Sequence, residues 1–192
     1  AEHILAARGT KPIWAYANDQ MASAAYMLGS AADKIITSPT GMVGSVGVIA
    51  VHVDRSEAEA SEGYKFTEVT SGTKKADSSP HKPLSTSGRS TLKAIVDQGM
   101  DVFVEFLGRA RGLDEESVRG LQGAIFTAAT SVENGLADSV ATMDDVVQSM
   151  FALVQESPAN ATGAYTGVKP KAENPSALEE VTVTDPKVVV TP

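Results

Sequence analysis

A serine begins a run of small residues near the N-terminus of this 192-residue sequence. Ser23 follows a polar turn, and the residues from Ser23 to Ala32 are rich in Ala, Met and Leu, which predicts a helix. Its hydroxyl can project toward a substrate, and the amide of Ala24 is one of the unpaired N–H groups of a helix start that can stabilise an oxyanion. A serine at a helix start also serves as an N-cap, so a catalytic role and a capping role are both open.

A nucleophilic serine needs a base to take its proton, and the sequence offers histidines and lysines. The three histidines stand in no recognisable catalytic motif, and a surface or structural role suits each of them; they are His3, His52 and His81. Lys74 and Lys75 lie in the glycine-bearing segment 71–77. A lysine amine accepts a proton only when it is neutral, which requires burial or suitable neighbouring charges. A solvated charge on a loop is the alternative for both lysines.

The composition argues against several classes of function. The net charge of −8 disfavours a nucleic-acid binder, which needs a basic surface to hold phosphates. The sequence contains no cysteine, which excludes disulfides, thiolate zinc sites and a cysteine nucleophile. No apolar run approaches the roughly 20 residues that span a bilayer, so no membrane segment is expected.

Short apolar runs alternate with helical patterns, which predicts an α/β fold. Strands are expected at residues 12–17, 34–37, 44–51 and 66–70. Helices are expected at residues 23–32, 55–62, 88–111 and 144–153, with a further one after an Asp114 N-cap. Residues 71–87 have the composition of a long loop, of the kind that is functional or disordered.

The composition changes after about Gln155. Residues 155–192 are rich in Pro, Ala, Thr and Val, which predicts a low-complexity tail that is disordered or extended. A peripheral strand at 181–183 or 188–190 is the alternative. We therefore expect one folded domain over residues 1–154, followed by this tail.

Several short motifs occur in an order that is typical of one family. They are Ala22-Ser23-Ala24-Ala25-Tyr26, Ala31-Ala32-Asp33-Lys34-Ile35, Gly44-Ser45-Val46-Gly47-Val48-Ile49, Ser71-Gly72-x-x-Lys75, Phe126-Thr127 and Gly135-Leu136-Ala137-Asp138. This ordered set resembles the signal-peptide-peptidase-A family of serine peptidases (peptidase family S49), most closely its phage branch of head or capsid maturation proteases. The resemblance covers the domain from about residue 4 to residue 150.

The resemblance implies a role for each of several positions. It identifies Ser23 as the nucleophile and Lys75 as the general base, with the adjacent Lys74 facing solvent. It implies that the backbone N–H of Ala24 contributes to the oxyanion hole. Ser45 resembles a position that hydrogen-bonds and orients the lysine, a turn serine being the alternative. We accordingly expect Ser23 and Lys75 to lie within hydrogen-bond reach of each other.

The resemblance also implies the ClpP/crotonase-like fold of stacked ββα units, with Tyr26 as a packing residue. It implies an endopeptidase that uses no metal and no organic cofactor and that self-associates into a homo-oligomer. Its substrates would be polypeptides. These would be capsid and scaffold proteins in the host cytoplasm or prohead. Signal peptides are the alternative, for a membrane-associated bacterial signal-peptide peptidase.

Relatives carry a Ser-Pro-Gly-Gly-like turn before the helix that matches residues 4–8, and its glycine amide supplies the other half of the oxyanion hole. The sequence begins after that point, so a domain that is incomplete at its N-terminus is expected. Two functions from other classes are the alternatives: a crotonase-type enzyme, which shares the fold, and a non-catalytic component that retains the motifs only as fold elements. A crotonase-type acyl-CoA enzyme would hold an enolate on backbone amides, and a capsid or scaffold component would need no catalytic side chain.

Overall fold

The structure, a computed structural model, describes residues 1–155, so the tail predicted beyond Gln155 lies outside the described residues. Within them the chain forms seven helices, namely α1 (Glu2–Ala7), α2 (Ala24–Ser30), α3 (Ser56–Ser61), α4 (Thr86–Arg111), α5 (Glu115–Gly120), α6 (Ala128–Glu133) and α7 (Met143–Gln155). The same residues form six strands, namely β1 (Trp14–Ala17), β2 (Gln20–Ala22), β3 (Lys34–Thr37), β4 (Met42–Gly44), β5 (Ile125–Thr127) and β6 (Ser139–Val140). No helix within residues 1–155 has the length and apolar character needed to cross a membrane.

The six strands form two three-stranded sheets. In the first, β1, β3 and β6 pair in parallel in the order β1-β3-β6, with Ala17 opposite Thr37. In the second, β2 pairs with β4 in parallel and β4 pairs with β5 antiparallel. The pair β1–β2 therefore continues as β3–β4, one step along each sheet, and α2 connects the two pairs. This repetition gives the stacked ββα, α/β architecture that the sequence predicts.

One hydrophobic core joins the sheets, α2 and the C-terminal half of α4. Its fully buried side chains include Tyr26 of α2, Ile35 of β3 and Leu107 of α4. The Tyr26 hydroxyl donates a hydrogen bond to the carbonyl of Leu136 at 3.1 Å, and burial raises the pKa of this phenol. Tyr26 is therefore a packing residue, as predicted.

Arg8 connects the C-terminal end of α2 to the C-terminal end of α4 by side-chain hydrogen bonds. Its guanidinium donates to the carbonyls of Ser30, Ala31 and Ala32 at 2.6 to 2.9 Å and to the carbonyl of Ala110 at 3.0 Å. Carbonyls in the last turn of a helix have no partner within the helix, so one side chain satisfies the ends of both helices. The position of α2, and of the turn that precedes it, is thereby fixed.

Both ends of the long helix α4 are capped. The hydroxyl of Ser85 accepts a hydrogen bond from the N–H of Gly88 at 2.9 Å, and Gly112 ends the helix in the left-handed region at φ 69°. The helix begins at Thr86, slightly before the predicted residue 88. Its buried apolar residues all lie between Phe103 and Ala110, so only the C-terminal half packs into the core.

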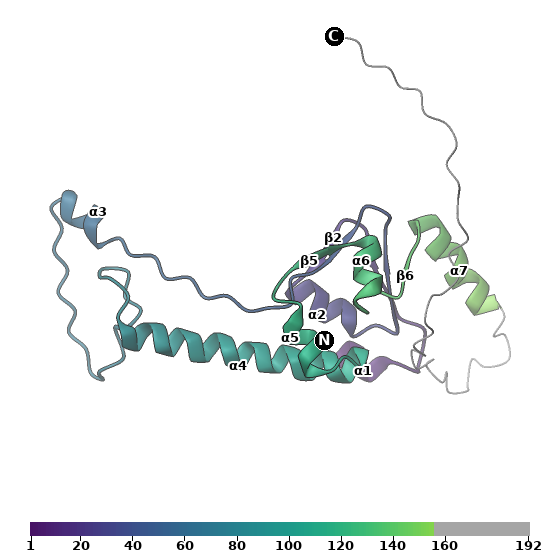
Figure 1. Cartoon of the computed structure of the whole chain (residues 1–192), viewed down its shortest axis with the longest axis horizontal. Helices are drawn as coiled ribbons and strands as arrows, with labels where there is room; N and C mark the ends of the chain where they lie inside the picture. Colours follow the sequence, from purple (N-terminus) through teal and green to yellow (C-terminus); the bar gives the residue numbers. More distant parts are fainter. Residues whose placement is uncertain (156–192) are drawn as a thin grey trace, which may run out of the picture.

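Residues 48–99 contribute nothing to the core, and we call them the arm; residues 1–47 and 100–155 form the body. Gly88 is the only buried residue of the arm. Figure 1 shows an extended segment that leaves the body and runs out to α3, and α4 leading back from that far end into the body. The arm is thus a long projection built from α3, the N-terminal half of α4 and extended chain.

Two predicted strands are wrong in part or in whole. The strand expected at 44–51 is present only as β4, which ends at Gly44, and residues 66–70 form no strand. Both stretches are extended in Figure 1. Alternating apolar residues favour extended chain, but a strand also needs a hydrogen-bonded neighbour. Within residues 1–155 neither stretch has one.

Candidate active site

Ser23 occupies the turn where the chain leaves β2 and enters α2. Its backbone has φ 53° and ψ −123°, an unusual conformation that costs a non-glycine residue about 1–3 kcal/mol. Hydrogen bonds hold the turn on both sides: the Ser23 N–H donates to the carbonyl of Gly44 at 2.9 Å, and the Ser23 carbonyl accepts from the N–H of Met27 at 3.0 Å. Strain of this kind persists only where the surroundings enforce it, and it is concentrated at functional sites.

The side chain of Ser23 is not used to cap the helix. Although Ser23 immediately precedes α2, its side chain makes no capping hydrogen bond. Ser23, Ala24 and Ala25 are all exposed, and the two alanines leave room for a peptide backbone to approach. The amide of Ala24 opens the helix and has no acceptor inside it. The Ser23 side chain therefore does not have the capping role that the sequence left open, and its catalytic role stays a prediction.

A second strained serine lies beside the first. Ala22 is opposite Gly44 in the parallel pair β2–β4, so Ser23 and Ser45 are the next residues along two adjacent strands. Ser45 has φ 52°, and its N–H donates to the carbonyl of Ala124 at 2.7 Å. Of the three non-glycine residues with positive φ in the described chain, two are these neighbouring serines. The fold therefore brings Ser45 to Ser23.

Gly44 makes this arrangement possible, although the sequence analysis named it only as the first residue of a motif. Its φ of 132° is open to glycine and strained for other residues. A Cβ at this position would lie 2.6 Å from the carbonyl oxygen of Ala124. Since the carbonyl of Gly44 also accepts the hydrogen bond from Ser23, this glycine positions the candidate nucleophile. The available signal in the sequence was the pair Gly44-Ser45 within its motif.

Lys74 and Lys75 lie in the arm, in the turn that precedes α4. The N–H of Lys75 donates to the carbonyl of Gly72 at 3.2 Å, and both lysines are exposed. They border a shallow hollow together with Glu68 and Ser79. A lysine acts as a base where burial removes water from its amine, and a single copy of the chain does not bury Lys75.

A single copy of the chain does not bring Ser23 and Lys75 together. Asp77, which follows Lys75 closely, accepts a hydrogen bond from the hydroxyl of Ser87 at 2.7 Å in the first turn of α4. The helix α2 packs instead on the body half of α4, around Phe103. The length of α4 between Ser87 and Phe103 is about 24 Å at 1.5 Å per residue. Figure 1 accordingly shows the start of α4 out in the arm and α2 in the body, near the other end of α4.

The histidines do not supply a base at Ser23. His52 Nε2 lies 2.9 Å from the carbonyl oxygen of Ser79, and His81 Nδ1 lies 2.9 Å from a carboxylate oxygen of Glu59. Both contacts hold parts of the arm together, which is the structural role predicted for them. The third histidine is an exposed residue of α1.

The turn between β2 and α2 thus presents two of the groups that acyl transfer requires. It presents a hydroxyl that can attack a carbonyl carbon and a backbone N–H that can hold the resulting oxyanion. Among residues 1–155, no three His, Asp or Glu side chains lie close enough together to hold a metal ion. A proton acceptor has to be brought to the turn from elsewhere.

The sequence matches a known family over most of its described length. The family model "Peptidase family S49" matches residues 6–156. The chain therefore belongs to peptidase family S49. This result confirms the family that the ordered motifs indicate and, with the two-sheet architecture, the α/β, ClpP/crotonase-like fold.

Named relatives come from phages and from bacteria. The chain is 31% identical over 150 residues to the capsid assembly protease C of Escherichia phage lambda, covering 78% of this chain and 34% of that protein. It is 28% identical over 148 residues to Protease 4 of Salmonella typhi, covering 77% of this chain and 24% of that protein. Among solved structures, it is similar to an enoyl-CoA hydratase/isomerase family member with a TM-score of 0.42 and 17% identity, covering 81% of this chain and 42% of that chain. The chain therefore spans about a third of the lambda relative and about a quarter of the Salmonella one.

Proposed function

We propose that this protein is a serine endopeptidase with Ser23 as nucleophile and Lys75 as general base, and that the two side chains of each working site come from two copies of the chain. The observation that carries the proposal is the turn between β2 and α2. There a strained, exposed serine keeps its hydroxyl free of any capping role. Membership of the S49 family supports a peptide bond as the target.

The proposed reaction is acyl transfer through a covalent intermediate. Neutral Lys75 Nζ accepts the proton of Ser23 Oγ while this oxygen bonds to the peptide carbonyl carbon, and the N–H of Ala24 donates to the oxygen that gains the electron pair. The protonated lysine then gives its proton to the leaving nitrogen as the C–N bond breaks. Lys75 next takes a proton from a water molecule as the water oxygen bonds to the acyl carbon. The protonated lysine then returns that proton to Ser23 Oγ as the bond between Oγ and the acyl carbon breaks.

Two features of the single chain support a lysine supplied by another copy. Lys75 is exposed, and a neighbouring copy that covered it would remove the water that keeps its amine charged. Ser45, proposed to orient the lysine, lies beside Ser23 and not beside Lys75 of its own chain. Both roles are satisfied together if the arm of one copy reaches the body of the next.

The proposed substrates are capsid or scaffold polypeptides that are cleaved during prohead maturation in the host cytoplasm. The lambda relative, whose name describes a capsid assembly protease, supports this choice over signal peptides. Polypeptides are the general substrate class of the family. The reaction as written uses no metal ion and no organic cofactor.

Subunit mixing tests the proposal. Ser23→Ala and Lys75→Arg are each expected to abolish cleavage of a labelled unfolded polypeptide, because arginine keeps the charge but cannot lose its proton. Co-refolding the two inactive variants should restore activity to about a quarter of the wild-type rate, since random neighbours unite an intact Ser23 with an intact Lys75 at one interface in four.

Lys74→Arg is the matched control and should keep wild-type turnover when it is measured alone. Mixed assemblies of Ser23→Ala and Lys75→Arg that form but remain inactive would exclude a site shared between copies. A Lys75→Arg variant that cleaves as fast as the wild type would exclude Lys75 as the base.

A further inference from the structure

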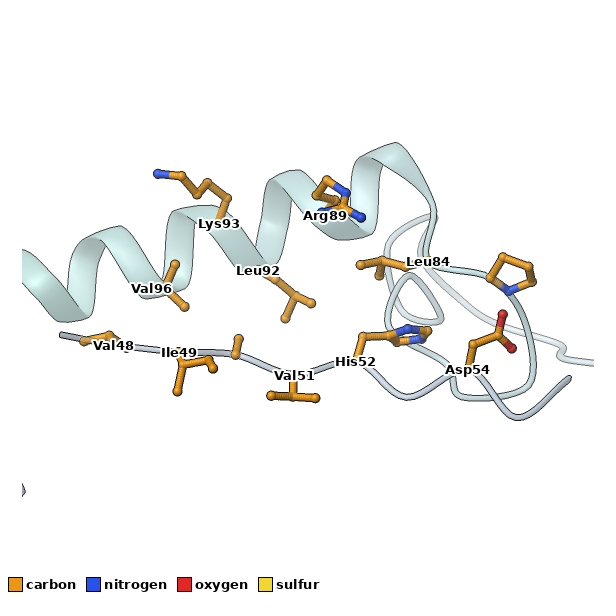
Figure 2. A pocket seen from close by; sticks show the side chains of 12 residues that line it. Val48, Ile49, Val51, His52, Asp54, Leu84, Arg89, Leu92, Lys93 and Val96 are labelled. Carbon is orange, nitrogen blue, oxygen red and sulfur yellow. The ribbon is translucent and has the colours of Figure 1, made fainter. Parts of the chain in front are cut away.

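The extended segment 48–54 connects the body to the outer part of the arm and runs beside α4. Figure 2 shows Val48 next to Val96, and His52 near Leu84 at the far end of the groove between segment and helix. The approach is close: a Cβ added to Gly99 of α4 would lie 3.2 Å from the methyl groups of Val48. One face of the segment therefore lies toward α4 across this groove and approaches the helix closely at Val48.

The opposite face of the segment is apolar and uncovered. Ile49, Val51 and Val53 are 84%, 75% and 60% exposed. In extended chain alternate residues lie on one face, so these three side chains form a single row. Figure 2 shows Ile49 and Val51 pointing away from α4. Burial of apolar side chains of this size is favourable, so this row has a strong tendency to be covered.

The backbone of the same segment also lacks partners. Within the described chain, the hydrogen bonds on either side are the Ser45 N–H to the Ala124 carbonyl and the Arg55 N–H to the Pro80 carbonyl. Between them, no backbone hydrogen bond to another described backbone group is made by residues 48–54. Unpaired extended chain presents a row of donors and acceptors to any strand that approaches. Segment 48–54 therefore has both parts of a β-type interface, an apolar face and a free edge.

We propose that the outward face of segment 48–54, formed by Ile49, Val51 and Val53, is the surface by which the arm docks on a second copy of this chain. The choice of occupant rests on the proposed function. If Lys75 serves Ser23 of another copy, the arm must lie along that copy, and segment 48–54 is the part of the arm that leads from the body toward the lysine turn (Figure 1). A strand of the second copy would pair with the free edge, and apolar side chains packed on the outward face would cover the row.

The chain contains no cysteine, so a single introduced thiol reports on this surface alone. Val51→Cys in the full chain is labelled with a maleimide at rising protein concentration. We expect its labelling rate to fall at least about tenfold as copies associate, by mass action. The control, Val147→Cys, lies in α7 and is 44% exposed in the wild type, and its labelling rate should stay constant.

Equal labelling of Val51→Cys at all concentrations would overturn the proposal. Protection of Val51→Cys that appears only when a polypeptide substrate is added would also overturn it, because the occupant would then be the substrate strand.

A charge substitution gives an independent readout. The double variant Ile49→Lys/Val51→Lys should sediment at a smaller mass than the wild type and lose peptidase activity, whereas Val147→Lys should keep the wild-type mass. Ser23→Ala should keep both the wild-type mass and the protection of residue 51. This control separates the two proposals, because loss of the Ser23 hydroxyl tests catalysis without altering the interface. A wild-type mass for the double variant, or a monomeric wild type at every concentration, would contradict docking through this face.

Discussion

The helix α4 belongs to both the body and the arm, and its two halves have different surroundings. In the body half, Phe103, Phe106 and Leu107 are at most 3% exposed and pack into the core. In the arm half, Gly88 is the only buried residue, because Asp77 packs over it. Continuous helical hydrogen bonding extends through both halves, yet only one of them is stabilised by apolar burial. The body half of α4 is therefore packed within one copy of the chain, whereas the arm half is mainly exposed.

The polar contacts differ in the same way. In the body, the Arg111 side chain is 6% exposed and forms a bidentate ion pair with Asp138, with N–O distances of 2.8 and 3.0 Å. The Asp138 carboxylate also accepts a hydrogen bond from the N–H of Ile35. In the arm, Lys82 pairs with Glu68 at 2.7 Å, but their side chains are 44% and 26% exposed. Exposed pairs contribute little because water and salt screen them. Such contacts connect parts of the arm but add little to its free energy of unfolding.

The largest expected effect comes from truncating the same side chain in each half of α4. Leu107→Ala removes a fully buried side chain from the core and should lower the free energy of unfolding by about 3 kcal/mol. Leu92→Ala, in the half-buried groove of the arm, should cost less than about 1 kcal/mol. Urea denaturation of both variants gives the comparison, and equal losses would show that the arm is as firmly packed as the body.

The sequence predicted the body better than the arm, for a physical reason. The strand 34–37 has its expected bounds, and Asp114 caps α5 by accepting from the N–H of Ser117 at 2.8 Å. Those features depend on local propensity and on a core within one chain. The strands expected at 44–51 and 66–70 failed beyond Gly44 because their alternating apolar residues lack a neighbouring strand in that chain.

For the candidate site, the sequence predicted which residues take part but not their backbone geometry. Motif order led to Ser23 and Ser45, and the fold brings these two residues side by side. The backbone strain at both serines was not visible in the sequence, because φ depends on how β2 and β4 pair. The contact between Ser23 and Lys75 stays a prediction, because one copy of the chain keeps them on different regions.

A smaller effect is expected from adding one methyl group at a glycine in each region. Gly44→Ala puts a Cβ against the carbonyl of Ala124 at φ 132°, which should cost about 2 kcal/mol of stability. Because the carbonyl of Gly44 accepts the hydrogen bond from the Ser23 N–H, peptidase activity should also fall about 10- to 100-fold.

Gly63→Ala is the matched variant in the arm. Gly63 also has a positive φ, 86°, but no atom lies within 4 Å of the added Cβ. It should cost about 1 kcal/mol of local strain, with little change in global unfolding. Equal loss of global stability in both variants would contradict the distinction between body and arm.

The smallest expected effect is a pH dependence carried by one aspartate in each region. The backbone N–H of Ser117 and then its hydroxyl lower the pKa of Asp114 in the body. In the arm, the hydroxyl of Ser56 and then its N–H lower the pKa of Asp54. Each carboxylate therefore contributes stability that is present above its unfolded pKa of about 3.9 and is lost as pH falls through its lower folded pKa.

Asp114→Asn should remove part of the acid destabilisation of the body. The midpoint of urea denaturation should then fall less steeply with pH below about pH 4. Asp54→Asn should leave that curve unchanged and should speed amide hydrogen exchange in α3, because the arm opens without unfolding the core. If Asp54→Asn changed the acid limb as much as Asp114→Asn does, arm and body would unfold as one cooperative unit.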